Sequence, residues 1–528
     1  MTLITFLHRW VGVVLALFMF VWFATGAVIA FVGSPFVDRA QQLAHAEPLA
    51  AEAGWLSLAE TLTRAAAQRA ETRPSDAVVG QVANHEAHSG GRHGAAQRPQ
   101  DSLVVEARLA RLGGAPLWLV EDERGQRSAL SALTGAPTKV GPDQAERIAA
   151  HWLDGAALSY LGEQDAPLGV RNAEAGKPYH RFAADDGREI VVSARTGEVA
   201  LVSTRAERGL IYAGAWLHLF RWLDVLGAGD YRRDALTYAG FFAAVGAATG
   251  IVVGFVKWKP GLFGRPTYSG RRTQPYREFW FKYHFWAGLV GGSFALLWAS
   301  SGFLSTNPGQ IFSPAGATKE ETARWRGAAQ PAAWSLPPAA TTPLAPEAVE
   351  LTWARLGEDT ALIAVGKDGG RRALATPGAL TSFDDTALIA AAQRLAGEKP
   401  VAGSARLDDY DSYYFPGHRQ SVLDKPLPVL RIDLADAGKT SLYVDPADGR
   451  LLAKFDASRR VWRWVYSAVH HWDFGVFHTH ALWIGWMAVW VSLGVVLAAS
   501  AVVLAVRRLR RSLPQRAAAA RPLEQQKA

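Results

Sequence analysis

The stretch HFWAGLVGGSFALLWASSG, residues 284–302, places a histidine at the start of an apolar run. A second stretch, HRWVGVVLALFMFVWFATG at residues 8–26, carries His, Trp, Gly, Phe, Trp and Gly at the same offsets of 0, 2, 4, 10, 14 and 18. The two copies begin 276 residues apart. An ionisable ring at the edge of an apolar helix is costly and usually functional. The sequence therefore indicates a duplication that includes the histidine.

Four segments of the 528-residue chain are apolar and contain no Asp, Glu, Lys or Arg: 10–32, 235–256, 285–305 and 481–506. Each is long enough to cross a hydrocarbon core of about 30 Å as a helix. The first run is too long for the apolar part of a secretory signal, so we expect an uncleaved anchor. The pattern predicts a multi-pass membrane protein surrounded by a lipid bilayer.

Positive charge lies beside these predicted spans. The link between the second and third spans, residues 257–282, carries seven Lys or Arg and one acid, and the tail after the fourth span begins RRLRR. By the positive-inside rule the link and both termini are cytoplasmic. The net charge of +8 then reflects retention at the membrane. Because no basic stripe is present, we expect no nucleic-acid partner.

The chain contains no cysteine. This excludes disulfides, thiolate–zinc sites, Cys-ligated iron–sulfur clusters and covalently attached c-type haem. Any haem would be held non-covalently through histidine. No G-x-G-x-x-G follows a strand and opens a helix, and no phosphate-binding loop is present, which argues against a nicotinamide or nucleotide domain. Electrons for a redox reaction would therefore have to come from quinol or from a separate cytoplasmic reductase.

The segments between the spans repeat as well. Residues 189–222 align without a gap on residues 441–474, so that Gly197 meets Gly449 and His218 meets His470. Each copy predicts a strand, a tight turn at RTGE or ADGR, a second strand and a helical approach to the membrane. PDQAERIAAHWL and TALIAAAQRLAG predict helices upstream. Parallel repeats of this kind are related by an axis along the membrane normal.

Several stretches of the second half carry a family resemblance: KYHFWAGLVGGSFALLWASSGFLSTNP, DSYYFPGHR, PLPVLRI, SLYVDPADGRLLAKFD and VHHWDF. Together they resemble the PepSY-associated transmembrane family of bacterial inner-membrane proteins. The first half is more divergent, with VVSARTGEV in place of the usual Tyr-Val-Asp-Pro pattern. The resemblance implies periplasmic PepSY domains and an association with iron uptake. Some members are similar to ferric-siderophore reductases that carry two b-type haems.

The expected fold is an α-helical membrane protein with four transmembrane helices as a two-fold repeat, plus two periplasmic α+β PepSY-like domains. The spans and the domains alternate along the chain, and both termini are expected in the cytoplasm. The predicted parts are transmembrane helix 1 (1–33), PepSY-like domain 1 (34–208), an interfacial helix with transmembrane helix 2 (209–258), a cytoplasmic loop (259–282), transmembrane helix 3 (283–305), PepSY-like domain 2 (306–458), an approach helix with transmembrane helix 4 (459–506) and a cytoplasmic tail (507–528).

His8 and His284 lie at the predicted cytoplasmic ends of spans one and three. At 100° per residue, offsets of 4, 14 and 18 fall within about 40° of the histidine's direction. The glycines at offset 4 would leave space for a flat macrocycle, and those at offset 18 lie about 27 Å further along, where a second macrocycle could need the same clearance. The tryptophans at offset 14 are expected to pack in the core. These positions are Gly12, Gly288, Gly26, Gly302, Trp22 and Trp298.

Two other interpretations of the first histidine pair stay open. Glycine-rich faces also let helices approach closely, and Gly246, Gly250 and Gly254 form a ladder of small residues typical of such contacts. The histidines could then make polar contacts with neighbouring helices, or transfer protons. Because both copies carry the same downstream glycines, we favour haem ligation by His8 and His284.

A second haem is predicted between His218 and His470, on the periplasmic side. Three neighbours rival His470 as its ligand: His471, His478 and His480. Two further stretches contain candidate ligands. Residues 84–94 offer His85, Glu86, His88 and His93 for a metal ion or form a solvated loop, and residues 408–419 form either a dock for a ferric complex or strand residues with a polar face.

The sequence thus leads to a first hypothesis of an inner-membrane oxidoreductase with two b-type haems. It would pass electrons to a periplasmic acceptor, and the resemblance favours ferric iron in a siderophore as that acceptor. The competing hypothesis is a non-enzymatic membrane scaffold whose PepSY domains bind a periplasmic peptide or protein. A permease-like role is disfavoured because the spans lack polar residues.

Overall fold

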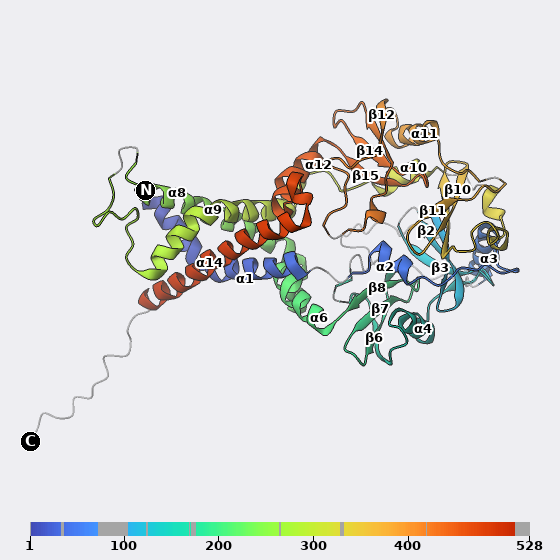
Figure 1. Cartoon of the computed structure of the whole chain (residues 1–528), viewed down its shortest axis with the longest axis horizontal. Helices are drawn as coiled ribbons and strands as arrows, with labels where there is room; N and C mark the ends of the chain where they lie inside the picture. Colours follow the sequence, from blue (N-terminus) through green and yellow to red (C-terminus); the bar gives the residue numbers. More distant parts are fainter. Residues whose placement is uncertain are drawn as a thin grey trace, which may run out of the picture. The chain divides into compact units, whose positions relative to one another are not determined.

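The computed structural model describes residues 2–32, 36–71, 104–122, 125–167, 169–170, 176–262, 266–327, 332–377, 379–418 and 420–512. The chain divides into two compact units (Figure 1). The helical unit comprises Met1–Ser34, Ala206–Ser313 and Arg460–Ala528, and the sheet unit comprises Pro35–Arg205 and Pro314–Arg459. Each unit therefore takes segments from both halves of the sequence.

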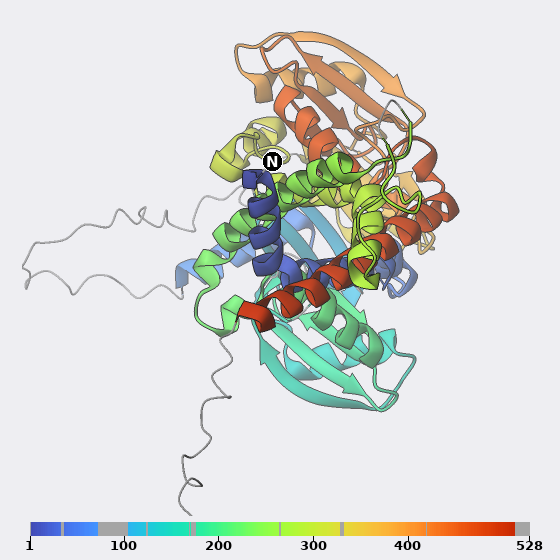
Figure 2. The ribbon, with the colours of Figure 1, turned by 90° about the vertical axis from the view of Figure 1, so that its left-hand side faces the viewer.

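Four long helices form the frame of the helical unit: α1 (Thr2–Val32), α8 (Arg232–Lys257), α9 (Phe279–Ser305) and α14 (His480–Ser512). Each contains one of the predicted spans, and all four are long and apolar enough to cross a membrane, which confirms the prediction. The shortest has 26 residues and is about 39 Å long. Helix α1 packs against α8 and α14, and α9 packs against the same two helices. Helices α1 and α9 therefore lie diagonally opposite each other in the bundle. Figure 2 views the bundle from the end at which the N-terminus of the chain lies.

Small residues permit the close helix packing. A Cβ atom on Gly240 of α8 would lie 3.1 Å from the backbone nitrogen of Phe303 on α9. On Gly291 of α9, it would lie 2.9 Å from side-chain atoms of Leu493 on α14. Because lipid tails are as apolar as leucine, helices in a membrane associate mainly through such packing.

Both helical approaches that the sequence predicts are present, but they are irregular. The first consists of α6 (Arg205–Ile211) and a π-helical turn at Tyr212–Trp216, and the second of α12 (Ala457–Trp462), a π-helical turn at Arg463–Ala468 and α13 (Val469–His471). Each approach ends at an aromatic residue in the left-handed region, Phe220 with φ 54° and Trp472 with φ 53°. These residues are opposite one another in the ungapped alignment, so the register between the two copies holds through both irregularities.

A seven-stranded antiparallel sheet lies at the centre of the sheet unit, in the order β11-β10-β9-β1-β2-β3-β4. Strands β1 to β4 come from the first half of the chain and β9 to β11 from the second. Their bounds are β1 (Val104–Leu112), β2 (Ala115–Asp122), β3 (Arg127–Ser131), β4 (Pro137–Thr138), β9 (Glu350–Leu356), β10 (Asp359–Val365) and β11 (Arg371–Ala373). The segments expected as two separate PepSY-like domains therefore share one sheet through the pairing of β1 with β9.

Two four-stranded antiparallel sheets complete the sheet unit. Each contains the predicted strand–turn–strand, and each is preceded by a predicted helix, α4 (Pro142–Trp152) or α11 (Asp385–Ala396). Gly197 and Gly449 lie in the predicted turns with φ of 78° and 65°, a conformation that favours glycine. The strands are β5 (Leu158–Gln164), β6 (Tyr179–Ala184), β7 (Glu189–Ser193) and β8 (Val199–Ser203) in one sheet, and β12 (Val401–Leu407), β13 (Val429–Leu434), β14 (Ser441–Val444) and β15 (Leu451–Phe455) in the other.

The junction of the two halves is buried. Trp118 of β2 and Trp353 of β9, the strands on either side of β1, are both 0% exposed. Their ring centres are 4.6 Å apart in an edge-to-face arrangement, a geometry that adds to the free energy of burying the rings. The core of the sheet unit thus depends on both halves of the chain.

Candidate functional site

The first predicted pair of histidines meets inside the helical unit. His8 projects from α1 and His284 from α9, the two diagonal helices, and their ring centres are 6.3 Å apart with an angle of 31° between the planes. A metal ion bonded to one nitrogen of each ring at about 2 Å would hold the ring centres roughly 6 Å apart. The observed spacing fits a single metal ion between the two rings.

Hydrogen bonds determine which nitrogen of each ring is available to a metal. His8 Nδ1 lies 3.1 Å from Gly246 O, and because a carbonyl only accepts, Nδ1 carries the hydrogen. His284 Nδ1 lies 3.0 Å from Ser500 Oγ, which itself donates to Leu497 O at 2.7 Å. The serine oxygen is therefore the acceptor for His284 Nδ1–H. In a neutral imidazole the other nitrogen then has a free lone pair, so both Nε2 atoms can bind a metal.

A glycine of α8 makes room for the His8 ring. A Cβ atom on Gly250 would lie 2.6 Å from His8 Cε1 and 2.9 Å from His8 Nδ1, which no side chain could tolerate without displacing the ring. Gly246, one turn earlier, supplies the carbonyl that accepts from His8. Gly246 and Gly250 belong to the ladder of small residues that the sequence associated with helix packing. They also make room for the His8 ring and supply its hydrogen-bond acceptor.

The second predicted pair is held by the same two long helices. Thr25 Oγ1 of α1 lies 3.1 Å from His218 Nδ1, and Ser301 Oγ of α9 lies 2.8 Å from His470 Nδ1. The offset from His8 to Thr25 equals the offset from His284 to Ser301. The two contacts, Thr25 with His218 and Ser301 with His470, therefore join equivalent positions of the two aligned copies.

The second pair is also in the form that binds a metal. Thr25 donates its hydroxyl hydrogen to Val21 O at 2.7 Å, and Ser301 donates to Trp298 O at 3.1 Å, so each hydroxyl oxygen accepts from the neighbouring histidine. Burial lowers the pKa of His218 to about 4. Burial, and then the nearby His471 and His218, hold the pKa of His470 well below its ordinary value. Both imidazoles are neutral at neutral pH, as metal ligation requires.

The two tryptophans that the sequence assigned to core packing also donate hydrogen bonds. Trp22 Nε1 donates to the carbonyl of His218 at 2.9 Å, and Trp298 Nε1 donates to the carbonyl of His470 at 3.1 Å. The approach helices end two residues after each histidine, at Phe220 and Trp472. Because the helix stops there, the backbone N–H four residues later does not bond to the carbonyl of either histidine, and the indole N–H takes its place.

The rivals of His470 have different surroundings. The ring of His471 is edge-on to that of His470, with ring centres 5.3 Å apart, and its carbonyl accepts from Trp483 Nε1. His478 Nε2 lies 2.9 Å from Asp473 O. The ring of His480 stacks on Trp483. The structure thus brings His470, and not its sequence neighbour, to the hydroxyl of α9.

The four predicted glycines have different environments. A Cβ atom on Gly12 would meet nothing within 4 Å, and one on Gly288 would touch only Leu497 at 3.6 Å. On Gly26 and Gly302 it would contact the imidazoles themselves, 3.5 Å from His218 Cε1 and 3.9 Å from His470 Cε1. Gly12 therefore borders open space, whereas Gly26 and Gly302 accommodate histidine rings.

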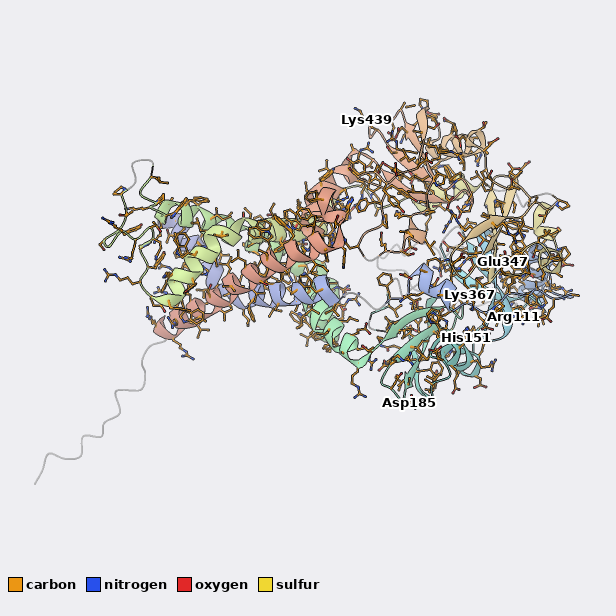
Figure 3. The ribbon with its side chains drawn as sticks, viewed as in Figure 1. Arg111, His151, Asp185, Glu347, Lys367 and Lys439 are labelled. Carbon is orange, nitrogen blue, oxygen red and sulfur yellow. The ribbon has the colours of Figure 1, made fainter. Side chains whose placement is uncertain are left out.

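A cavity in the described part of the sheet unit lies beside charged side chains, including Arg108, Glu198, Glu350 and His151; Figure 3 labels His151. Arg108 is 2.8 Å from Glu198 and 3.3 Å from Glu350, and Arg39 is 2.5 Å from Glu350, so the two carboxylates are paired with two arginines. The space accessible to the centres of water-sized molecules is about 60 Å³. This is enough for a few waters and far too small for a ferric chelate.

Two candidate stretches remain, around residues 84–94 and 408–419. His85, Glu86, His88 and His93 lie outside the described residues, as does Arg419. In the stretch around residue 411, the hydroxyl of Tyr443 donates to Asp411 at 2.7 Å and that of Tyr414 donates to Pro426 O at 2.7 Å. These groups hold the local structure together. Residues 408–418 lie in the connection between β12 and β13 and form no strand, so the interpretation of this stretch as strand residues is wrong.

The paired histidines fit a haem better than a bare metal ion. Among the residues that the structure describes, no group of three or more His, Cys, Asp or Glu could hold a metal ion. The two imidazoles of His8 and His284 leave the other coordination positions to the cofactor, and a porphyrin supplies its own four nitrogens. The chain has no cysteine, and histidine is a common axial ligand of a haem that is held non-covalently.

Four apolar helices and separate β-sheets, with histidines paired among the helices, define a multi-pass membrane protein with PepSY-type α+β regions. The chain belongs to the PepSY-associated transmembrane family: the family model described as the PepSY-associated TM region matches residues 5–395. A search of curated proteins gave no match.

Proposed function

We propose that the protein is an inner-membrane oxidoreductase with two b-type haems that passes electrons to a periplasmic acceptor. The observation that carries the proposal is that all four predicted histidines make a hydrogen bond through Nδ1, which leaves Nε2 for a metal, and that His8 and His284 have the spacing of a shared metal ion. When bound, haem iron supplies one-electron chemistry. The residues of the chain would hold and orient it.

In this proposal His8 and His284 bind one haem and His218 and His470 bind the other. The buried hydroxyls and the Gly246 carbonyl keep each ring in one tautomer, and the apolar helices exclude water from the ligands. The positive link and tail set the topology, with both termini in the cytoplasm and the sheet unit in the periplasm. The suggested acceptor, ferric iron in a siderophore, and the donor, quinol or a separate cytoplasmic reductase, follow from the family and from the sequence.

The proposal is tested first by haem content. The full chain, purified in detergent from haem-sufficient cells, should show a Soret band and two haems per chain in a pyridine haemochrome assay. His8→Ala and His284→Ala should lose one haem, and His218→Ala and His470→Ala the other. Colourless protein would contradict the proposal and favour the alternative of a membrane scaffold that binds a periplasmic peptide or protein.

The open space beside Gly12 allows a sharper test. Gly12→Leu adds a side chain where the Cβ position has no protein neighbour within 4 Å, so the substitution should disturb a bound macrocycle while leaving the helices packed. Gly485→Leu is the matched control, because the Cβ position of Gly485 on α14 is equally open. Loss of one haem in Gly12→Leu alone is expected. Full haem in both variants would show that no cofactor lies beside Gly12.

A further inference from the structure

We infer that Thr25 and Ser301 are positioning residues for a metal site: their hydroxyls fix the tautomer of His218 and His470, and Trp22 and Trp298 hold the same two residues by the backbone. The inference deepens the proposed function and rests on it for the identity of the metal as haem iron. The two pairs, Trp22 with Thr25 and Trp298 with Ser301, are called here the histidine clamps.

Each hydroxyl can act only as an acceptor toward its histidine. Its single hydrogen is already donated within its own helix, to Val21 O in one clamp and to Trp298 O in the other. Thr25 is 6% exposed and Ser301 is 1% exposed, so water cannot readily replace them. The hydrogen of each imidazole must therefore be on Nδ1, since the alternative tautomer would leave two lone pairs facing each other.

The second arm of each clamp holds the backbone. Phe220 and Trp472 take left-handed conformations that end the approach helices. Phe220 N donates to Leu217 O and Trp472 N donates to Ala468 O, which leaves the carbonyls of His218 and His470 for the indole N–H groups. Residues three apart on a helix lie on one face, so one face of α1 or α9 contacts both the ring and the backbone of one histidine. Two such contacts restrict both rotation of the ring and displacement of the residue.

The same arrangement in both aligned copies argues against chance. The donors are identical tryptophans, and the acceptors, threonine and serine, share only the hydroxyl that the argument requires. Residues that hold the second nitrogen of a metal-bound histidine fix its tautomer and raise its basicity. A more basic imidazole stabilises ferric over ferrous iron, so loss of the hydroxyl should raise the midpoint potential of that haem.

The test uses the full-length protein with the variants Thr25→Val and Ser301→Ala. Loss of such a partner typically weakens metal binding by about 10- to 100-fold, and we expect a loss of this size for one haem, together with a rise in its midpoint potential in a spectroelectrochemical titration. The other haem should be unchanged. Thr25→Ser, which restores the hydroxyl, and Ser305→Ala, which removes a hydroxyl that donates to Gly302 O, should behave as the unmodified protein.

A second measurement separates this inference from the proposed function. Solid-state NMR of 15N-histidine distinguishes the two tautomers whether or not haem is bound, with His218→Ala and His470→Ala assigning the signals. Unmodified haem affinity, potential and tautomer in Thr25→Val and Ser301→Ala would overturn the inference and leave the proposed function standing. A protein without haem would overturn the proposed function, and a tautomer change in the two variants would then still support the clamps as the elements that fix both histidines.

Discussion

At the scale of single residues, the hydroxyl of Ser301 distinguishes two adjacent histidines. It lies 2.8 Å from Nδ1 of His470, and neighbouring residues on a helix point about 100° apart, so His471 cannot take the place of His470 without rotating the helix. His470→Ala should therefore lose one of two haems, as His218→Ala does, while His471→Ala largely retains both. Haem per chain, measured on matched purifications, checks this. Loss of haem in His471→Ala alone would transfer the ligand role to His471.

A second prediction at this scale concerns Gly250, which leaves space for the His8 ring. In Gly250→Ala the new methyl group would lie 2.6 Å from His8 Cε1, so the ring must move. We expect loss of the haem between His8 and His284, and a destabilisation of about 1–3 kcal/mol from overpacking. Gly254→Ala is the control, since its methyl would be in ordinary contact with Leu289 at 3.6 Å. Haem content and thermal unfolding measure the two effects; equal behaviour of the variants would show that the ring adapts without cost.

At the scale of elements, the sequence predicted what depends on local pattern. Long runs without charge predicted the four helices, and the alternating strands around Gly197 and Gly449 predicted two equivalent turns. The π-helical turns and the left-handed Phe220 were not predictable. Gly214 lies in the first π-helical turn, but the equivalent second turn contains neither glycine nor proline, and Phe220 is not a residue type that favours a positive φ. The acceptors Thr25 and Ser301 were missed for a different reason: they become neighbours of His218 and His470 only through tertiary packing. A hydroxyl at the same offset in both copies was the one signal that could have identified them.

Ion pairs join the elements of the sheet unit, and they predict an acid limit to its stability. Burial alone would raise the pKa of Glu198, but Arg108 of β1 and then Arg127 of β3 outweigh burial and lower it to about 2 from an ordinary 4.5. Since the folded pKa is below the unfolded one, the resulting stability, roughly 3 kcal/mol, is present above pH 4.5 and is lost as the pH falls toward 2. Thermal unfolding between pH 7 and pH 3 should show this loss.

The control for that prediction is a substitution at the same position. Glu198→Gln should unfold at a lower temperature at pH 7 and lose less stability on acidification, because it has no proton to take up. Asp186→Asn, which removes an exposed partner of Arg188, should keep the acid response of the unmodified protein. An unchanged response in Glu198→Gln would assign the acid sensitivity to other carboxylates.

At the scale of the whole molecule, the pairing of β1 with β9 constrains the topology. Residues 35–205 follow α1 and residues 314–459 follow α9, and both segments belong to one compact unit. Two spans, α8 and α9, separate them along the chain, and two crossings return the chain to the same side of a membrane. Connectivity and sheet pairing therefore agree with each other, and if all four helices span the membrane, the Lys- and Arg-rich link between α8 and α9 is expected on the opposite side.

The distribution of positive charge predicts the direction in which the helices insert into the membrane. Reporter fusions in the link at Arg271 and after Arg511 should report the cytoplasm, because Lys and Arg near the ends of spans are retained there. Fusions near residue 90 and at Gly369 should report the periplasm. Alkaline phosphatase and green fluorescent protein fusions at each position give opposite readouts and control for expression. A periplasmic signal at Arg271 would invert the arrangement and place the site of His8 and His284 on the wrong side to receive electrons from a cytoplasmic donor.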